Sequence, residues 1–271
     1  MTASTQWQLA RDSAKRYQTV LTPAILGPFA RALVEFASPQ KGEWIVDVGC
    51  GTGAAARYAA EAVGSTGKIA AVDMNASMID VARSLPVVAG APIEWHVALA
   101  TDLPLDDQSV DVALCAQTLQ FLPEKQLSLI EMQRVVKEDG HVAVSLWTPI
   151  EDNPYFYTLV ETMARHVGVE TAVGLKAAFA LTDAAEIYNL LQESGFGQIE
   201  MQETQLDLLM PELTDFVPRH IQATPMATGF NQASKAIQQT VIREVAEKLN
   251  RYAENGRIQI PFRSHMILCK K

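Results

Sequence analysis

The sequence lacks the features of a membrane-spanning or disulfide-stabilised protein. No run of about 18 apolar residues occurs in the 271-residue chain, so we expect no membrane span. The N-terminal stretch carries no apolar signal-peptide core, which makes the cytoplasm the default compartment. The cysteines Cys50, Cys115 and Cys269 lie far apart and form no C-x-x-C pair. This spacing argues against both a disulfide framework and a zinc site.

Basic clusters are also scarce. The formal net charge is −9, and no long run of lysine and arginine occurs. Proteins that bind nucleic acid usually carry a basic patch or stripe, so we do not expect nucleic acid as a substrate. A small molecule is the expected partner, and the sequence leaves the oligomeric state open.

Strand and helix patterns alternate between about residue 43 and residue 147. Short apolar runs, each followed by a turn and mostly by a segment with helical spacing, occur at 44–49, 67–74, 93–99, 110–117 and 140–147. Repeated β-α units predict a parallel sheet with helices on both faces. We therefore expect an α/β fold with a Rossmann-like, seven-stranded, mostly parallel sheet, whose last two strands lie near residues 198–210 and 258–271.

Three segments do not follow the β-α rhythm and predict a helical cap. We expect a cap segment at 1–37, a core at 38–149, a cap insertion at 150–182, and the rest of the core at 183–271 with a second cap insertion at 211–235. In an open α/β sheet the ligand lies outside the carboxyl ends of the strands. Insertions that follow strands can fold over that edge as a lid.

The glycine-rich turn after the first strand, in "IVDVGCGTG", predicts a nucleotide site. Gly49 and Gly51 with Ala54 fit the dinucleotide spacing G-x-G-x-x-A, and with Gly53 they fit the tighter G-x-G-x-G. Asp47 favours the second pattern, because a carboxylate beside the turn would repel a pyrophosphate. It would attract the ammonium and sulfonium groups of S-adenosylmethionine, so this compound is the expected cofactor.

Asp73 ends the second strand beside the turn and is expected to accept the hydroxyls of a ribose, while Met74 can flank an adenine. Dinucleotide enzymes use the same acidic position, so an NAD(P)-dependent oxidoreductase remains an alternative. A Tyr-x-x-x-Lys pair, which that alternative would favour, does not occur in the chain. A cofactor-binding relative without transferase activity is a further alternative.

Four stretches together resemble the class I S-adenosylmethionine-dependent methyltransferases, in particular those of ubiquinone and menaquinone biosynthesis. They are "VDVGCGTG", "VDMNASMIDVAR", "LPLDDQSVDVALCAQTLQFLPE" and "EMQRVVKEDGHVAVSLW", in the family's order. The resemblance implies methyl transfer, O- or C-directed, to a small molecule. The aromatic and apolar residues of the cap insertions favour a lipophilic metabolite such as a polyketide, a phenol or a quinone precursor.

The resemblance also implies roles for individual residues. Asp47, Gly49 and Gly51 would hold the methionine end, and Asp73 and Met74 the ribose and adenine. Gln117 would line the cofactor near its sulfur, Tyr17 would approach the methionine carboxylate, and Ala100 would contact adenine through its backbone. The chain departs from the family at Leu99, where a side-chain acid often binds the adenine amino group; Asp102 is a substitute.

No catalytic triad or metal cluster is evident among the polar residues. An activated methyl group needs alignment and exclusion of water more than strong acid-base chemistry. Of the five histidines, His96, His141 and His265 fall in predicted strands, and His166 lies in the first cap insertion. We predict His220, in the second insertion, as the catalytic base if one is used; a mechanism without a base is the alternative.

Overall fold

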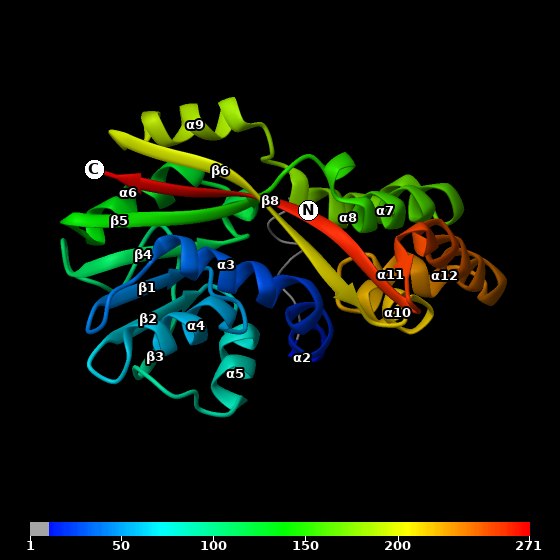
Figure 1. Cartoon of the computed structure of the whole chain (residues 1–271), viewed down its shortest axis with the longest axis horizontal. Coiled ribbons are helices and arrows are strands. Elements are labelled where there is room, and N and C mark those ends of the chain that lie inside the picture. The colour runs from blue at the N-terminus through cyan, green and yellow to red at the C-terminus, as the bar shows by residue number, and fades with distance from the viewer. Residues whose placement is uncertain (1–10) are drawn as a thin grey trace.

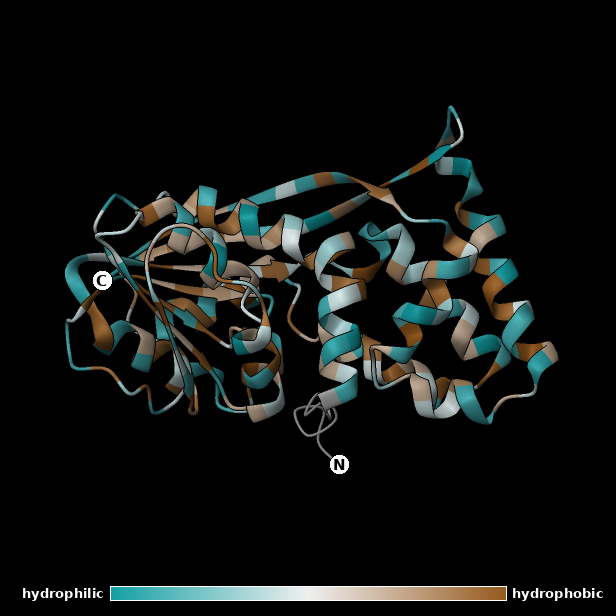
Figure 2. Cartoon of the chain, turned by 90° about the horizontal axis from the view of Figure 1, so that it is seen from below, coloured by the Kyte–Doolittle hydropathy of each residue, from teal (hydrophilic) through white to brown (hydrophobic). Residues whose placement is uncertain are grey.

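The computed structural model describes residues 11–271. Figures 1 and 2 show a lobe built on the sheet, a lobe built of helices, and an N-terminal helix that lies between the two. The two lobes are also joined by the long strands β6 (Gln198–Met210) and β8 (Arg257–Lys270), which leave the sheet and run into the helical lobe.

The sheet has the order β3-β2-β1-β4-β5-β8-β6, as predicted for a seven-stranded and mostly parallel sheet. The pairs among β1 to β5 are parallel, and β8 runs antiparallel to both β5 and β6. A short eighth strand, β7 (Ala253–Glu254), pairs only with β8. The remaining strands are β1 Trp44–Val48, β2 Lys68–Asp73, β3 Ile93–Val97, β4 Val110–Ala116 and β5 Val136–Trp147.

Helices cover both faces of the sheet. α3 (Gly27–Ala37) and α4 (Ala54–Val63) bury apolar residues on the face to which β1 presents Ile45. α6 (Lys125–Val135) and α9 (Ala184–Glu193) pack on the opposite face, to which β1 presents Val46. α5 (Ala76–Ser84) packs beside β2 and β3. Because side chains alternate along β1, this strand contributes apolar residues to both layers, as expected for a strand buried on both faces.

The N-terminal helix is continuous but not regular. α2 (Arg11–Arg16) passes into a π-helical stretch, η1 (Tyr17–Leu26), and then into α3. Pro23 lies inside η1 and has no N–H to donate, and the N–H of Gly27 reaches the carbonyl of Thr22, five residues earlier. π-helical turns occur often at functional sites. This one begins at Tyr17, a residue predicted to contact the cofactor.

The same helix is the one described segment that is long and apolar enough, by length and composition, to cross a membrane. It spans Asp12–Ala37, and half of its most apolar window is buried inside the protein. It contacts strands of the sheet, α4, α5 and a cap helix, α10 (Leu213–Gln222). This burial is the arrangement of a core helix, whose apolar face packs against other elements.

The helical lobe, which we call the cap, combines two stretches of the chain. The first contains η3 Ile150–Asp152, α7 Pro154–His166, α8 Val169–Lys176 and η4 Ala177–Phe179. The second, between β6 and β8, contains α10, α11 Ala227–Gln232, α12 Lys235–Leu249 and η5 Asn250–Tyr252. Figure 2 shows apolar and polar residues alternating along these helices, and apolar residues such as Leu159, Phe216 and Val241 belong to one buried cluster.

One expected boundary is wrong. We expected the second cap insertion to end at residue 235 and the helix after it to belong to the core. Instead, α12 packs against α7 and α10, and Glu244 of α12 lies 2.6 Å from His166 of α7. The amphipathic pattern of α12 predicts a helix correctly but does not say which surface its apolar face will cover.

Candidate functional site

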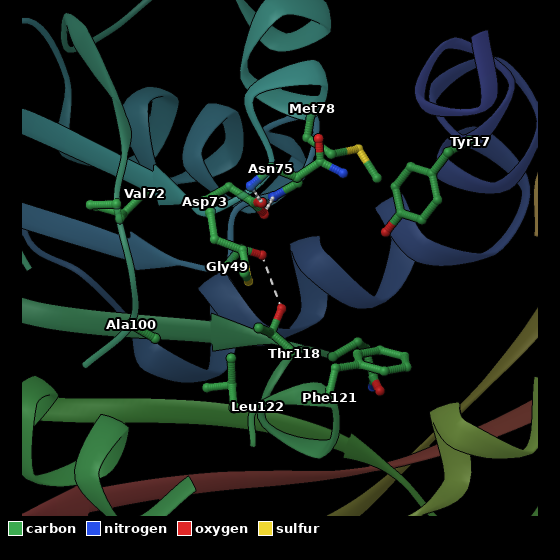
Figure 3. A pocket seen from close by; sticks show the side chains of 14 residues that line it. Tyr17, Gly49, Val72, Asp73, Asn75, Met78, Ala100, Thr118, Phe121 and Leu122 are labelled. Carbon is green, nitrogen blue, oxygen red and sulfur yellow. Dashed lines mark hydrogen bonds between the residues drawn. The ribbon is translucent and has the colours of Figure 1, made fainter. Parts of the chain in front are cut away.

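The glycine loop between β1 and α4 passes close to two side chains, and this close approach requires glycine. Gly49, Gly51 and Gly53 all have positive φ angles, of 69°, 54° and 88°. A Cβ on Gly49 would lie 2.0 Å from the Cγ2 atom of Thr118, and one on Gly53 would lie 2.3 Å from the ring of Trp95. Thr118 also donates a hydrogen bond to the carbonyl of Gly49 at 2.9 Å (Figure 3). The loop is thus held against the end of β4.

Asp47 is buried beneath this loop, with 1% of its surface exposed. Its Oδ2 atom accepts a hydrogen bond of 2.9 Å from the N–H of Ala56, in the first turn of α4. The Oδ1 atom is buried and has no partner among residues 11–271. Asp47 lines a small pocket behind the loop, and Tyr17 and Gln117 line it too. Burial raises the pKa of Asp47 to about 7, so a cation placed there would ionise it.

Asp73 ties the ends of two neighbouring strands together. Its Oδ2 atom accepts a hydrogen bond from the N–H of Gly51, and its Oδ1 atom accepts one from the N–H of Asn75, both at 2.8 Å. Asn75 in turn caps α5, where its Oδ1 atom accepts from the N–H of Ser77 at 2.9 Å. Burial raises the pKa of Asp73 above its usual value. The carboxylate therefore organises the loop as well as facing the cleft.

The glycine-loop cleft, as we call it, lies above the carboxyl ends of β1, β2 and β4. Figure 3 shows Tyr17 pointing into it from the N-terminal helix, with Asp73 and Asn75 on one wall and Phe121 and Leu122 on another. The cleft brings together seven of the eight predicted cofactor residues, while Asp47 lies in the pocket behind the loop. Its lining is Tyr17, Gly49, Gly51, Val72, Asp73, Met74, Asn75, Met78, Ala98, Ala100, Gln117, Thr118, Phe121 and Leu122.

The residues predicted to lie beside the adenine depart from the family pattern at Leu99, as the sequence indicates. Leu99 is 52% exposed and is absent from the cleft lining, whereas Ala98 and Ala100 line it. Asp102, which we considered as a substitute acid, is exposed and does not line the cleft either. On this side the cleft therefore offers backbone groups and apolar side chains such as Met74, which is 42% exposed.

Gln117 stands where the cleft meets a second pocket. Its backbone has a positive φ of 51°, uncommon for a residue other than glycine, and its N–H donates to the carbonyl of Ser145 at 3.0 Å. The side-chain Nε2 atom donates to Ser264 at 2.8 Å, and the Oε1 atom is buried with no partner in the described chain. The strained backbone and the fixed amide together hold one free acceptor atom at this junction.

The second pocket, which we call the cap pocket, lies between the glycine-loop cleft and the cap. It shares Tyr17, Gln117 and Phe121 with the cleft, so the two pockets adjoin each other at these residues. No described Asp, Glu, Lys or Arg side chain lines it. Its lining is Tyr17, Leu21, Ile25, Leu26, Gln117, Gln120, Phe121, Trp147, Phe156, Leu175, Ala178, His220 and Thr224.

His220, the predicted catalytic residue, lies in α10 and lines the cap pocket with 1% of its surface exposed. Its Nδ1 atom is 2.8 Å from the hydroxyl of Tyr155, and the two rings stack at 5.3 Å. Burial lowers the pKa of His220 to about 3 and raises the pKa of Tyr155 well above 10. Both side chains are therefore neutral at physiological pH.

The other histidines lie outside these two pockets. His141 and His265 bond to the backbone carbonyls of Ala37 and Thr182, and His166 pairs with Glu244. His96 lies near Glu94 on β3, at 3.8 Å. Within residues 11–271 no group of three or more histidine, cysteine or acidic side chains is placed to hold a metal ion.

The sequence analysis did not single out several residues of the two pockets. In the cleft these include Asn75 as a wall residue and Met78, Thr118 and Leu122. In the cap pocket they are mostly apolar and come from separate segments, and they include Gln120 and Trp147. Thr118 and Gln120 follow β4 directly, and their position at a strand end was the one signal that could have indicated them.

We expect Asp73→Ala to weaken the binding of S-adenosylhomocysteine by about 1.5–3 kcal/mol, the scale for a hydrogen bond to a charged group. The variant also leaves the N–H groups of Gly51 and Asn75 without their acceptor, so its melting temperature should fall too. Calorimetric titration and thermal unfolding would measure the two effects. Asp102→Ala is the control, because this carboxylate is exposed and does not line the cleft. Unchanged affinity in Asp73→Ala would remove Asp73 from the binding site.

The chain matches a family model described as a methyltransferase domain over residues 46–144. These residues run from β1 into β5 and include the glycine loop, Asp73 and Gln117. The match therefore covers the elements that form the glycine-loop cleft, apart from the N-terminal helix with Tyr17, and it excludes the cap.

Curated relatives extend this similarity. The ubiquinone/menaquinone biosynthesis C-methyltransferase UbiE of Laribacter hongkongensis is 28% identical over 200 residues, which cover 69% of this chain and 82% of the relative. The chloroplastic 2-phytyl-1,4-beta-naphthoquinone methyltransferase of Arabidopsis thaliana is 30% identical over 115 residues, 41% of this chain and 44% of the relative.

Solved structures share the fold. A SAM-dependent methyltransferase of Thermotoga maritima superimposes with a TM-score of 0.55 at 17% sequence identity, and the match covers 100% of each chain. At this identity the likeness concerns the arrangement of helices and strands and carries no argument about the acceptor.

Proposed function

We propose that this chain, which belongs to the class I S-adenosylmethionine-dependent methyltransferases, methylates a small, uncharged and largely apolar acceptor such as a phenol, a polyketide or a quinone precursor. The family match sets aside the oxidoreductase that the glycine spacing left open. One observation carries the proposal: an uncharged, aromatic-lined cap pocket adjoins the glycine-loop cleft at Tyr17 and Gln117.

The residues around the glycine loop fit the cofactor. The unpartnered Oδ1 atom of Asp47 offers an acceptor for the ammonium of the methionine end, and the hydroxyl of Tyr17 offers a donor for its carboxylate. Gly49 and Gly51 leave backbone approach open, and Asp73 faces the ribose hydroxyls from the cleft wall. Met74 and Ala100 would enclose the adenine, and Gln117 would lie near the sulfur.

The nature of the cap pocket supports an uncharged acceptor. A charged group buried without a partner is strongly unfavourable, and the pocket offers no described charged side chain to pair with it. Mostly apolar and aromatic walls with a few polar groups are typical of small-molecule sites. Quinone-related acceptors, which the names of the relatives mention, have this chemistry.

The cofactor supplies an already activated methyl group, so the protein has to align the acceptor and keep water out. Methylation of a hydroxyl breaks the sulfur–methyl bond, leaves the electron pair on sulfur, forms an oxygen–carbon bond and releases the hydroxyl proton. We assign His220 as the acceptor of that proton or of its hydrogen bond. Since Nδ1 faces Tyr155, the Nε2 atom must do this, which requires the tautomer with the proton on Nδ1.

The acceptor class can be tested with pairs of compounds that differ only in charge. The enzyme is incubated with S-adenosylmethionine and either 4-hydroxybenzoic acid or its methyl ester, alongside naphthols and naphthohydroquinones, and products are analysed by mass spectrometry for the gain of one methyl group. We expect methylation of neutral compounds only. Methylation confined to the charged member of each pair would contradict the proposal.

His220→Ala is expected to reduce turnover by about 10²-fold or more, on the scale of general acid-base contributions, with little effect on cofactor affinity. Because the pKa of His220 is about 3, the wild-type rate should show no histidine titration between about pH 6 and 9. Tyr155→Phe removes the group that selects the tautomer and should lower the rate less. Wild-type turnover in His220→Ala across this pH range would show that the reaction needs no base there.

A further inference from the structure

Gln120 is a buried glutamine that the fold does not use. It lies in the middle of a short 3-10 turn, η2 (Leu119–Phe121), immediately after β4, and is 4% exposed. The turn is held by backbone hydrogen bonds from Phe121 to Thr118 and from Leu122 to Leu119. The side chain of Gln120 contributes none of these bonds and lines the cap pocket.

Both polar atoms of this side chain are unsatisfied. The Nε2 and Oε1 atoms of Gln120 are buried, and neither has a hydrogen-bond partner among residues 11–271. Burying an amide in this state destabilises the fold, and such unpaired groups are rare in folded proteins. A leucine would fill the same space without that cost, so the amide needs an explanation outside the fold.

Among the other polar side chains of the pocket, the hydroxyl of Tyr17 is assigned to the cofactor, and three others are each held by one hydrogen bond. Gln117 donates to Ser264, His220 faces Tyr155, and Thr224 donates to the carbonyl of Ile221. Gln120 is therefore the side chain that offers the pocket a free donor and a free acceptor together. The Nε2 and Oε1 atoms are bonded to the same carbon, so the donor and the acceptor lie side by side.

We propose that Gln120 determines the acceptor specificity of this enzyme, and that the acceptor carries a hydroxyl group and a carbonyl oxygen on neighbouring carbon atoms. The hydroxyl donates to Oε1 and the carbonyl oxygen accepts from Nε2, so one ligand edge satisfies both atoms. The assignment rests on the proposed function, since it concerns the molecule that the cap pocket receives. It narrows the acceptor from neutral aromatic compounds in general to hydroxycarbonyl compounds.

The enzyme should discriminate between acceptors because a buried polar atom of Gln120 that is left unpaired weakens binding. A compound with a hydroxyl alone, or a carbonyl alone, satisfies one atom of the amide and leaves the other buried without a partner. Sites built to hydrogen-bond a polar group reject analogues that lack it far more strongly than apolar pockets reject a change of size. We expect at least a tenfold preference for the complete hydroxycarbonyl group, about 1.4 kcal/mol.

Three bicyclic probes of similar size test this preference. 3-Hydroxychromone carries a hydroxyl beside a carbonyl, chromone carries the carbonyl alone, and 2-naphthol carries the hydroxyl alone. Their affinities are measured by calorimetry in the presence of saturating S-adenosylhomocysteine, with the wild type and with Gln120→Leu. Gln18→Leu is the matched control, because Gln18 also has a buried, unpartnered Oε1 atom but lines a different groove, beside Pro28 and Arg31.

In the wild type and in Gln18→Leu, 3-hydroxychromone should bind at least tenfold more tightly than either analogue, and in Gln120→Leu this preference should disappear. Gln120→Leu should also melt at a higher temperature without ligands, because it removes two unsatisfied groups. Equal binding of the three probes by the wild type, or an unchanged preference in Gln120→Leu, would overturn the assignment while leaving the proposed function intact. Failure of all three to bind, with S-adenosylhomocysteine still bound, would overturn both.

Discussion

Asp47→Asn should weaken the binding of S-adenosylhomocysteine by roughly 10- to 150-fold at pH 8, which corresponds to about 1.5–3 kcal/mol. The carboxylate is buried, and its Oδ1 atom has no partner in the described chain, so a ligand ammonium would gain a charged acceptor there. Asparagine keeps an oxygen that can accept from the N–H of Ala56, so α4 should form as before. The loss of affinity therefore reports the contribution of the negative charge and not a change in the fold.

The pH dependence gives this prediction a second, independent measurement. The pKa of Asp47 is about 7 in the free protein, and an ammonium favours the ionised form, so ligand binding should release a proton. Affinity in the wild type should then rise as the pH increases through 7 and level off above it, whereas Asp47→Asn should lose this rise. Calorimetry at several pH values measures both.

5′-Methylthioadenosine is the matched control ligand, because it keeps the adenosine and the sulfur but lacks the amino acid end. Its affinity should not respond to Asp47→Asn. If the variant weakens both ligands equally, Asp47 acts through the shape of the loop and not through the ammonium.

Gly49→Ala should unfold or severely destabilise the protein, by about 2–5 kcal/mol, while Gly51→Ala should cost about 1–2 kcal/mol. Both residues have positive φ angles, so both substitutions incur a backbone cost. They differ in the space available: a Cβ on Gly49 would lie 2.0 Å from Thr118, whereas one on Gly51 would meet nothing closer than 3.9 Å, at the ring of Tyr17.

Chemical denaturation of the two unliganded variants would measure this difference, and cofactor binding would be measured separately on whatever folds. Gly51→Ala serves as the control for backbone strain within the same loop. Similar destabilisation of the two variants would show that the close approach of Thr118 yields easily, and that the loop is not held against β4 as tightly as the geometry indicates.

Local patterns predicted the parts of the structure that depend on short stretches of chain. The strand at 198–210 was predicted from alternation and has those bounds in the structure, because an edge strand with one buried face repeats every two residues. The glycine turn and Asp73 follow from the rule that ligands lie at the carboxyl ends of parallel strands. The hydrogen bonds of Asp73 to Gly51 and Asn75 could not be predicted, since they depend on the exact path of the loop.

The cap was harder to predict because its contacts join distant segments. Pro218 lies inside α10, although proline lacks the N–H of a helical hydrogen bond, and Phe216 and Ile221 of the same helix are buried. Nothing local indicates that Trp147 and His220 face the same pocket. The position of Gln120 shortly after β4 is its one sequence signal, and it is a weak one, since an isolated glutamine is ordinarily a surface residue.

The pairing of β6 with β8 bears on how this enzyme could acquire new acceptors. Met210, the last residue of β6, pairs directly with Ile258, near the start of β8. The chain therefore leaves the sheet and returns to it at neighbouring points, and everything between forms a cassette whose two ends meet. Such a cassette can be lengthened, shortened or exchanged between related enzymes without changing the register of the sheet or the glycine loop. His220 lies inside the cassette, whereas Gln120 and all the residues assigned to the cofactor lie outside it, so exchange would replace one wall of the cap pocket and keep the machinery of methyl transfer.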